Sequence, residues 1–217
     1  VIGMKYLYSN MPYSDVGNYT FDTYLDYVQQ GIYLWENSPY VKNYPELYFL
    51  NYVLFHRTND EEIKPCRTYF WKKIKDKVQG KAMVEAALEI NHWCAGEVMY
   101  QGTDVRTGSA LEIYRSGVGR CGEEAVFVVN VMRSAGIPAR PVYVPRWSHC
   151  DDNHAWVEVW CDGDWHYLGA CEPEAVLDKG WFTNAASRAM MIGSRWYDRA
   201  MPDEKVIGKD RKSTRLN

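Results

Sequence analysis

The segment from His154 to Cys171 constrains the fold more than any other part of the chain. Its first half, HAWVEVWC, alternates aromatic and aliphatic residues, and DWHYLGAC continues as a second strand after Asp162-Gly163. An Asp-Gly pair between two such runs is typical of a two-residue hairpin turn, because both turn positions take a positive φ. We therefore expect an antiparallel hairpin in which Cys161 pairs with Asp164.

A helix that begins at a cysteine precedes this hairpin. Its apolar residues share one helical face: Cys121, Ala125, Val128, Val129 and Met132. Gly136 and Pro138 then supply a stop signal. The following segment, ARPVYVPRW, has strand character but contains two prolines, which predicts an edge strand or an irregular one.

The first half of the chain is predicted to be helical. Pro45-Glu46 opens PELYFLNYVLFHR, and the residues from Met83 to Tyr100 have the spacing of an amphipathic helix. Between them, FWKKIKDKVQGK predicts a short, charged surface helix. Residues 101–119 show no clear period, and a connection of this length in a compact domain is often functional.

Composition excludes two classes of protein. With 47% hydrophobic residues among 217, the chain can bury a core, and its net charge of −3 argues against a nucleic-acid binder. No run of about 18 apolar residues occurs, so we expect no membrane span.

The two ends of the sequence indicate a segment of a longer protein. Val1 is not an initiator methionine, and the stretch from Lys209 to Asn217 is polar. The compartment and the oligomeric state therefore stay open.

We predict three regions: N-terminal helices over residues 1–80, a core over residues 81–198, and a polar tail or linker over residues 199–217. The six cysteines are too sparse for a disulfide scaffold, and no C-x-x-C pair occurs. A zinc site could in principle use His149, Cys150, His154 and Cys161, but their spacing matches no strong template. We therefore predict no metal and no cofactor.

Cys121 is the strongest candidate for chemistry. The unpaired N–H groups at a helix N-terminus favour a thiolate and can stabilise an oxyanion. A nearby imidazole can take the thiol proton and return it to a leaving group. Glu123 and Glu124 act against this, since negative charges in the first turn raise the pKa of a neighbouring thiol. The structural alternative for Cys121 is a buried residue that opens a core helix.

Three blocks, GRCGEEA, DNHAWVEV and DWHYLGACE, resemble the core of the transglutaminase-like proteins, a papain-like superfamily that includes the peptide N-glycanases. The resemblance covers roughly Asn91 to Pro173. It implies an α+β fold in which N-terminal helices precede a central helix that opens with the catalytic cysteine and packs on an antiparallel sheet. It also implies that Cys121 is the nucleophile and His154 the general base. The alternative for His154 is an ordinary strand histidine.

The position of the acid that would orient the imidazole is where this sequence departs from the family pattern. Alignment on the ACE triplet places Gly169 in the acid position, whereas alignment on an acid followed by proline places Glu172 there. In the expected hairpin register Gly169 lies opposite Trp156, on the same side as His154, and Glu172 points the other way. Glu172 could reach His154 only through a bulge or if the chain swings near Pro173. We predict Glu172 as the third site residue.

The predicted activity is cysteine-dependent acyl transfer at amide bonds of peptides or glycopeptides, of protease, transglutaminase or amidase type. The oxyanion would be bound by the Cys121 N–H and by one side chain, for which Asn91, Trp93 and Gln101 are candidates. The alternative is a catalytically inactive transglutaminase-like module that binds peptide or glycan, and Gly169 in the acid position favours it.

Overall fold

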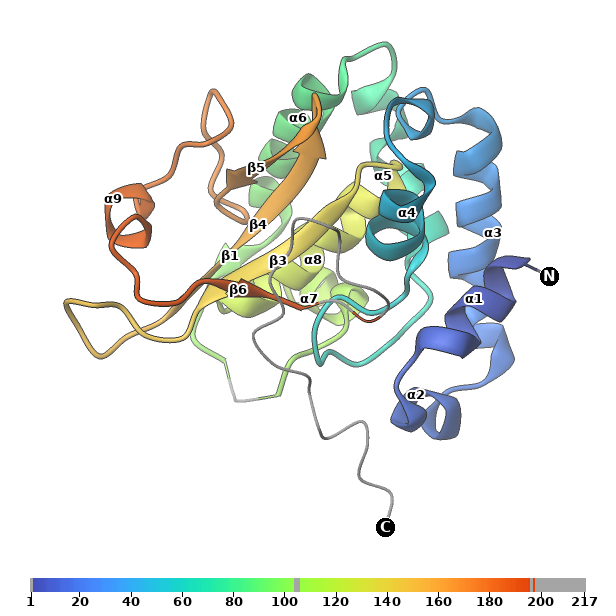
Figure 1. Cartoon of the computed structure of the whole chain (residues 1–217), viewed down its shortest axis with the longest axis horizontal. Coiled ribbons are helices and arrows are strands. Elements are labelled where there is room, and N and C mark those ends of the chain that lie inside the picture. The colour runs from blue at the N-terminus through green and yellow to red at the C-terminus, as the bar shows by residue number, and fades with distance from the viewer. Residues whose placement is uncertain (1, 104–105, 196, 198–217) are drawn as a thin grey trace.

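The C-terminal half of the protein contains a four-stranded antiparallel sheet (Figure 1). This computed structural model describes residues 2–103, 106–195 and 197. The strand order is β5-β4-β3-β6, with β3 at Ala139–Val144, β4 at His154–Cys161, β5 at Asp164–Leu168 and β6 at Gly193–Ser194. Cys161 pairs with Asp164, and Asp162 and Gly163 have φ values of 53° and 93°. The predicted hairpin is therefore confirmed.

Helices make up most of the first 134 residues. They are α1 (Ile2–Asn10), α2 (Tyr13–Asn18), α3 (Phe21–Asn37), η1 (Val41–Asn43), α4 (Glu46–Phe49), η2 (Leu50–Leu54), α5 (Arg67–Val78), α6 (Met83–Glu97), α7 (Ala110–Ser116) and α8 (Cys121–Ser134). A parallel pair of two-residue strands, β1 (Met99–Tyr100) and β2 (Val118–Gly119), precedes α8. A short helix, α9 (Thr183–Ala186), follows the hairpin. The predicted α+β class is confirmed.

Helix α8 is the centre of the core. Every residue from Glu123 to Ser134 is buried, and α5, α6, α7, β3 and β4 all pack on this helix. Two buried arginines satisfy backbone carbonyls where the π-helical turn η2 ends, and an asparagine holds one of them. Arg67 donates to the carbonyls of Val53 and Phe55, Arg133 donates to that of Phe55, and the side chain of Asn130 accepts from Arg67. These bonds join the N-terminal helices to α8.

The two faces of the sheet pack against different partners. Val157, Val159 and Cys161 of β4 belong to the large core cluster around α8. Trp156 lies on the other face, in a smaller cluster with Val142, Val144, Trp147 and Phe182. Since successive strand residues point to opposite faces, His154 shares the face of Trp156, and Ala155 faces α8. This alternation determines which face receives each side chain of the site.

Two sequence expectations are corrected by the packing. The lysine-rich helix α5 is not only a surface helix, because Phe70, Ile74 and Val78 are buried beneath its charged side. Strand β3 is internal and regular, although an edge or irregular strand was expected. Its short neighbour β6 pairs only with Val142 and Tyr143, so the Pro141 nitrogen interrupts no ladder bond there. Pro145 follows the last residue of the strand.

Two of the predicted segments are subdivided in the structure. The helix expected from Met83 to Tyr100 ends at Glu97, since Val98 is extended and the next two residues pair with β2. The long connection over residues 101–119 contains α7 and β2. One continuous core cluster extends from Leu7 to Ala170. The division at residue 80 stays a prediction, and the proposed tail at residues 199–217 lies outside the described residues.

Candidate functional site

The candidate site lies at one end of the sheet. Cys121 is the first residue of α8, His154 is the first residue of β4, and β5 ends at Leu168, just before the turn that carries Glu172. Because α8 packs on β4, the start of the helix and the start of the strand meet at this end. The fold thus brings the three predicted site residues into one region.

The surroundings of the half-buried Cys121 thiol oppose its ionisation. Burial raises the pKa of Cys121 above its usual range, and Glu124 adds to this, while the backbone N–H groups of Ala155 and Gly122 lower the pKa in part. The expectation that the helix N-terminus would favour the thiolate is therefore outweighed by desolvation. The contact with Ala155 places the sulfur beside the backbone of the residue that follows His154.

The imidazole of His154 lies among aromatic rings. The centroid of its ring is 4.7 Å from that of Trp181, 5.1 Å from that of Phe182 and 6.2 Å from that of Trp147. Burial lowers the pKa of His154 to about 4, so the ring is neutral at pH 7. Its Nε2 atom is buried and has no hydrogen-bond partner among residues 2–103, 106–195 and 197. A neutral imidazole with a vacant nitrogen is able to accept a proton.

A tight turn directs Glu172 back over Gly169. The N–H of Glu172 donates to the Gly169 carbonyl at 3.1 Å, and Cys171 between them has a left-handed φ of 57°. A Cβ atom on Gly169 would lie 2.4 Å from Oε2 of Glu172. The carboxylate therefore occupies the space into which a side chain at the predicted acid position would point. The swing of the chain that the sequence allowed is present, and it begins because the ladder ends at Leu168.

Trp181 contacts both Glu172 and His154 and so connects the two. The indole Nε1 of Trp181 donates to both carboxylate oxygens of Glu172, at 3.0 Å each, and the indole ring is in contact with the imidazole. Within the described part of the chain, no hydrogen bond joins the His154 ring to Glu172 or to the Cys121 sulfur. No sequence pattern indicated Trp181, because it lies beyond the hairpin in a segment without a period.

Glu123 anchors the loop that precedes the site. Its carboxylate accepts hydrogen bonds from the hydroxyl of Thr103 at 2.5 Å, from the N–H of Gly108 at 3.1 Å and from the N–H of Arg120 at 3.2 Å. The last of these is the N-cap residue of α8. The side chain of Glu123 therefore holds both the loop and the start of α8. This role was not predicted from the sequence.

The three oxyanion candidates have different surroundings. The side chain of Asn91 is already used, since its Nδ2 donates to the Gly169 carbonyl at 2.9 Å and its Oδ1 accepts from the Cys171 N–H at 3.1 Å. Trp93 stacks on Tyr114 in the core. Gln101 is exposed, and its N–H donates to the Gly119 carbonyl, which places it beside the chain that leads to Cys121. Of the three side chains, only that of Gln101 is exposed.

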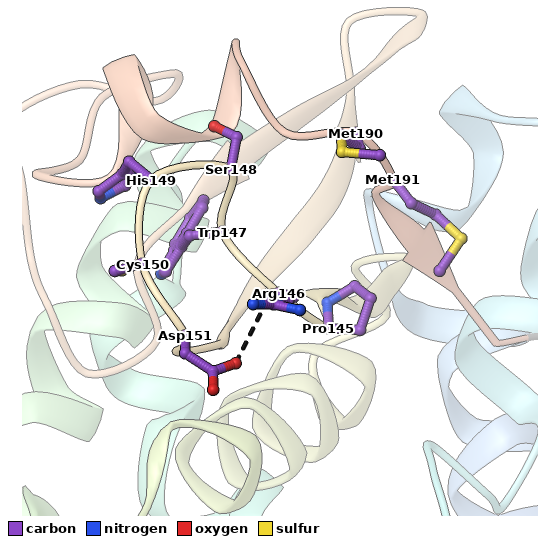
Figure 2. A pocket seen from close by; sticks show the side chains of 9 residues that line it. All are labelled: Pro145, Arg146, Trp147, Ser148, His149, Cys150, Asp151, Met190 and Met191. Atoms are coloured by element: carbon purple, nitrogen blue, oxygen red, sulfur yellow. Dashed lines mark ion pairs between the residues drawn. The ribbon is translucent and has the colours of Figure 1, made fainter.

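A hollow of about 510 Å³ lies next to the aromatic rings (Figure 2). Residues 145–151, the loop between β3 and β4, form most of its wall, and Met190 and Met191 complete it. Arg146 and Asp151 form an exposed ion pair at 3.3 Å across the loop. Trp147 lines the hollow and also lies against His154, so the hollow adjoins the candidate site.

The arrangement of potential ligands argues against the zinc alternative. His154 and Cys161 point to opposite faces of β4 and therefore cannot share an ion. Residues 2–103, 106–195 and 197 contain no group of three or more His, Cys, Asp or Glu side chains that could hold a metal. In the same residues, no helix is long and apolar enough to cross a membrane.

Part of the chain matches the model of a known protein family. The family model described as the transglutaminase-like superfamily matches residues 72–170, a segment that contains Cys121 and His154 and ends two residues before Glu172. A provisionally assigned cysteine protease from Cytophaga hutchinsonii is 20% identical, with a TM-score of 0.40, over 62% of this chain and 52% of that chain. Legionella pneumophila LapG is 17% identical, with a TM-score of 0.42, over 56% of this chain and 68% of its own. The matched region thus spans about half the length of the Cytophaga protein. No curated protein matches the sequence significantly.

Proposed function

We propose that the protein is a cysteine-dependent acyl-transfer enzyme that acts on amide bonds of peptides or glycopeptides. The match of residues 72–170 to the model of the transglutaminase-like superfamily supports this proposal. One observation carries the proposal. The thiol of Cys121 is partly buried, and Cys121 is the first residue of α8. The sulfur lies at the start of β4, in contact with the backbone of Ala155, the residue that follows His154. This chemistry requires a nucleophile and a neutral base that can come within hydrogen-bond reach of each other, and the proposal places Cys121 and His154 in these roles.

In the proposed reaction, His154 takes the proton of the Cys121 thiol as the sulfur attacks the amide carbonyl carbon. The carbon–nitrogen bond breaks, the imidazolium gives its proton to the leaving nitrogen, and an acyl-enzyme thioester remains. Water then gives hydrolysis, or a second amine gives transamidation. The N–H groups at the start of α8 stabilise the oxyanion. Glu172 acts through Trp181, whose ring it orients against the imidazole.

Alkylation by iodoacetamide across a range of pH, read by mass spectrometry at each cysteine, tests the nucleophile. We expect the rate at Cys121 to exceed that at the buried Cys66, Cys94 and Cys161, and to fall in His154→Ala but not in His92→Ala. His92 is an exposed histidine on α6 and serves as the matched control. Equal and slow alkylation of Cys121 and the buried cysteines would contradict the proposal.

A substrate screen then separates the reaction types. Ammonia release, amine incorporation and peptide cleavage are scored separately with wild type, Cys121→Ser and Glu172→Gln. We expect Cys121→Ser to abolish the activity and Glu172→Gln to weaken it about tenfold or more, since an orienting carboxylate assists but is not itself the base. Unchanged activity in Glu172→Gln would remove this residue from the site.

The second candidate is an inactive module that binds peptide or glycan. The contacts of His154 with Trp181 and Phe182, and the absence of a carboxylate at position 169, favour it. This module would leave Cys121 no more reactive than the buried thiols while binding a ligand next to Trp147 and Trp181. Quenching of tryptophan fluorescence by peptides or glycans without turnover would support it over the enzyme.

A further inference from the structure

Two carboxyl groups lie close together beside Cys121. Glu124 follows the cysteine by three residues on α8, so both side chains lie on the same side of the helix. The second carboxyl is that of Glu172, which the turn after β5 brings over Gly169. The charge of Glu172 acts on Glu124, and the charges of both act on the Cys171 thiol. The three groups therefore form one cluster next to the candidate nucleophile.

The two carboxyl groups differ in their hydrogen-bond donors. Glu172 accepts from the Trp181 indole through both oxygens. Glu124 is only 4% exposed and accepts no hydrogen bond from any residue in the described ranges. A buried carboxyl group without donors ionises only at high cost next to the charge of a second carboxylate, so the negative charge stays where donors and solvent stabilise it. That site is Glu172, and the proton remains on Glu124.

We propose that Glu124 is a positioning residue that stays protonated beside Cys121. The two carboxyl groups of Glu124 and Glu172 then carry a single negative charge between them, and the thiol has no ionised glutamate next to it on its own helix. This inference deepens the proposed function, because it explains how a thiol can ionise next to an acidic pair. Burial and the charge of Glu172 raise the pKa of Glu124 to about 8, in agreement with the geometry. Ionisation of Glu124 above this pH would oppose formation of the thiolate.

The other titratable groups near Glu124 come from its own helix and from two further elements. Cys121 opens α8, Cys171 and Glu172 lie in the turn after β5, and the Cys171 thiol acts on Cys94 of α6. Burial raises the pKa of both Cys94 and Cys171.

Carbon-13 NMR of protein labelled at the glutamate carboxyl groups tests the inference directly and requires no substrate. We expect one glutamate that titrates near pH 8, that is lost in Glu124→Gln, and that titrates at lower pH in Glu172→Gln because the neighbouring charge is gone. Glu174→Gln, which removes an exposed ion pair with Lys179 from the same loop, is the matched control and should leave this titration unchanged. A wild-type spectrum in which every glutamate titrates below pH 6 would overturn the proposal.

The effect on the thiol is measured by alkylation of Cys121 between pH 6 and pH 10. In Glu124→Gln, which keeps the shape of the protonated acid, we expect alkylation at pH 9 to be roughly tenfold faster than in wild type, since one negative charge is removed. An unchanged or slower rate in a Glu124→Gln protein with a wild-type circular dichroism spectrum would contradict the role. If turnover is never found but both titrations appear, the proposed function fails and the inference about Glu124 stands.

Discussion

His154 has surroundings that make the protein sensitive to acid. Its folded-state pKa of about 4 lies below the ordinary value of 6.5. As the pH falls from 6.5 towards 4, the unfolded chain binds a proton that the folded protein does not, and stability is lost. The same burial keeps the ring neutral at pH 7, so that a ring nitrogen is free to accept a proton, although the ring is a weaker base than an exposed imidazole.

We predict that the free energy of unfolding falls by up to about 1.4 kcal/mol per pH unit over this interval because of His154 alone. Urea unfolding at pH 7, 6, 5 and 4.5 measures the slope in wild type and in His154→Gln. The variant should lose this part of the pH dependence, and the exposed His92→Gln should keep it. Identical slopes in wild type and His154→Gln would show that the folded protein binds the proton as readily as the unfolded chain.

Among the elements, the turn from Gly169 to Glu172 depends on the absence of a side chain at its first residue. A Cβ on residue 169 would lie 2.8 Å from the Cβ of Glu172 as well as 2.4 Å from its Oε2. The first contact involves the stem of the side chain and can be relieved only if the turn shifts. The carboxylate and its bond to Trp181 would move with it.

Gly169→Ala should therefore destabilise the protein by about 1–3 kcal/mol and shift the indole N–H resonance of Trp181. Gly96→Ala, in helix α6, is the control, since an added Cβ there meets nothing within 4 Å. It should be neutral or slightly stabilising. Denaturant unfolding and nitrogen-15 NMR supply the two measurements, and an unshifted Trp181 resonance in Gly169→Ala would contradict the described turn.

The loop before the site should depend on Glu123 in a graded way. Glu123→Ala removes the acceptor of three hydrogen bonds and should cost about 1–3 kcal/mol, whereas Thr103→Val removes one bond and should cost less. Hydrogen exchange at the amide of Gly108 reports on the loop itself. If that amide keeps full protection in Glu123→Ala, the loop is held by other contacts.

The hairpin and α8 could be predicted from sequence because their signals are local. Asp162-Gly163 determines its own turn, and the apolar period after Cys121 determines one helix. The position of Glu172 could not be predicted, since it depends on where the β5 ladder ends and on the left-handed φ of Cys171. Extending the register past Leu168 placed the side chain on the wrong side. Trp181 was missed, because its contacts join segments far apart in sequence. Glu124 was expected as a first-turn charge that raises the thiol pKa, but its burial could not be read from the helix pattern.

At the scale of the whole molecule, buried charges connect the first helices to the rest. Asp15 of α2 is 1% exposed and accepts hydrogen bonds from Arg57 Nε at 2.7 Å and from the ring of His56 at 2.8 Å. Hydrogen bonds from His56 and Arg57, together with the charge of Arg57, hold the pKa of the Asp15 carboxyl below its usual range despite burial. Loss of this carboxylate would leave the Arg57 guanidinium buried without its anion.

Asp15→Asn should therefore destabilise the protein by about 3–5 kcal/mol. Asp22→Asn, an exposed first-turn residue of α3, should change stability by less than about 1 kcal/mol. Guanidinium unfolding followed by far-ultraviolet circular dichroism and by tryptophan fluorescence should give coincident transitions if the core is one unit. Two separate transitions would instead indicate that residues 1–80 fold independently of the segment that follows.

The complete enclosure of α8 from Glu123 onward has a consequence for how the protein can change. A helix surrounded on all sides cannot slide or tilt without disturbing its neighbours, so the sulfur at its tip is held at a constant location. The segments 145–151 and 181–192 lie outside this enclosure. Under the proposed acyl transfer, replacements in them would alter which acyl groups are accommodated while the sulfur stays in place, so selectivity and reactivity could diverge independently.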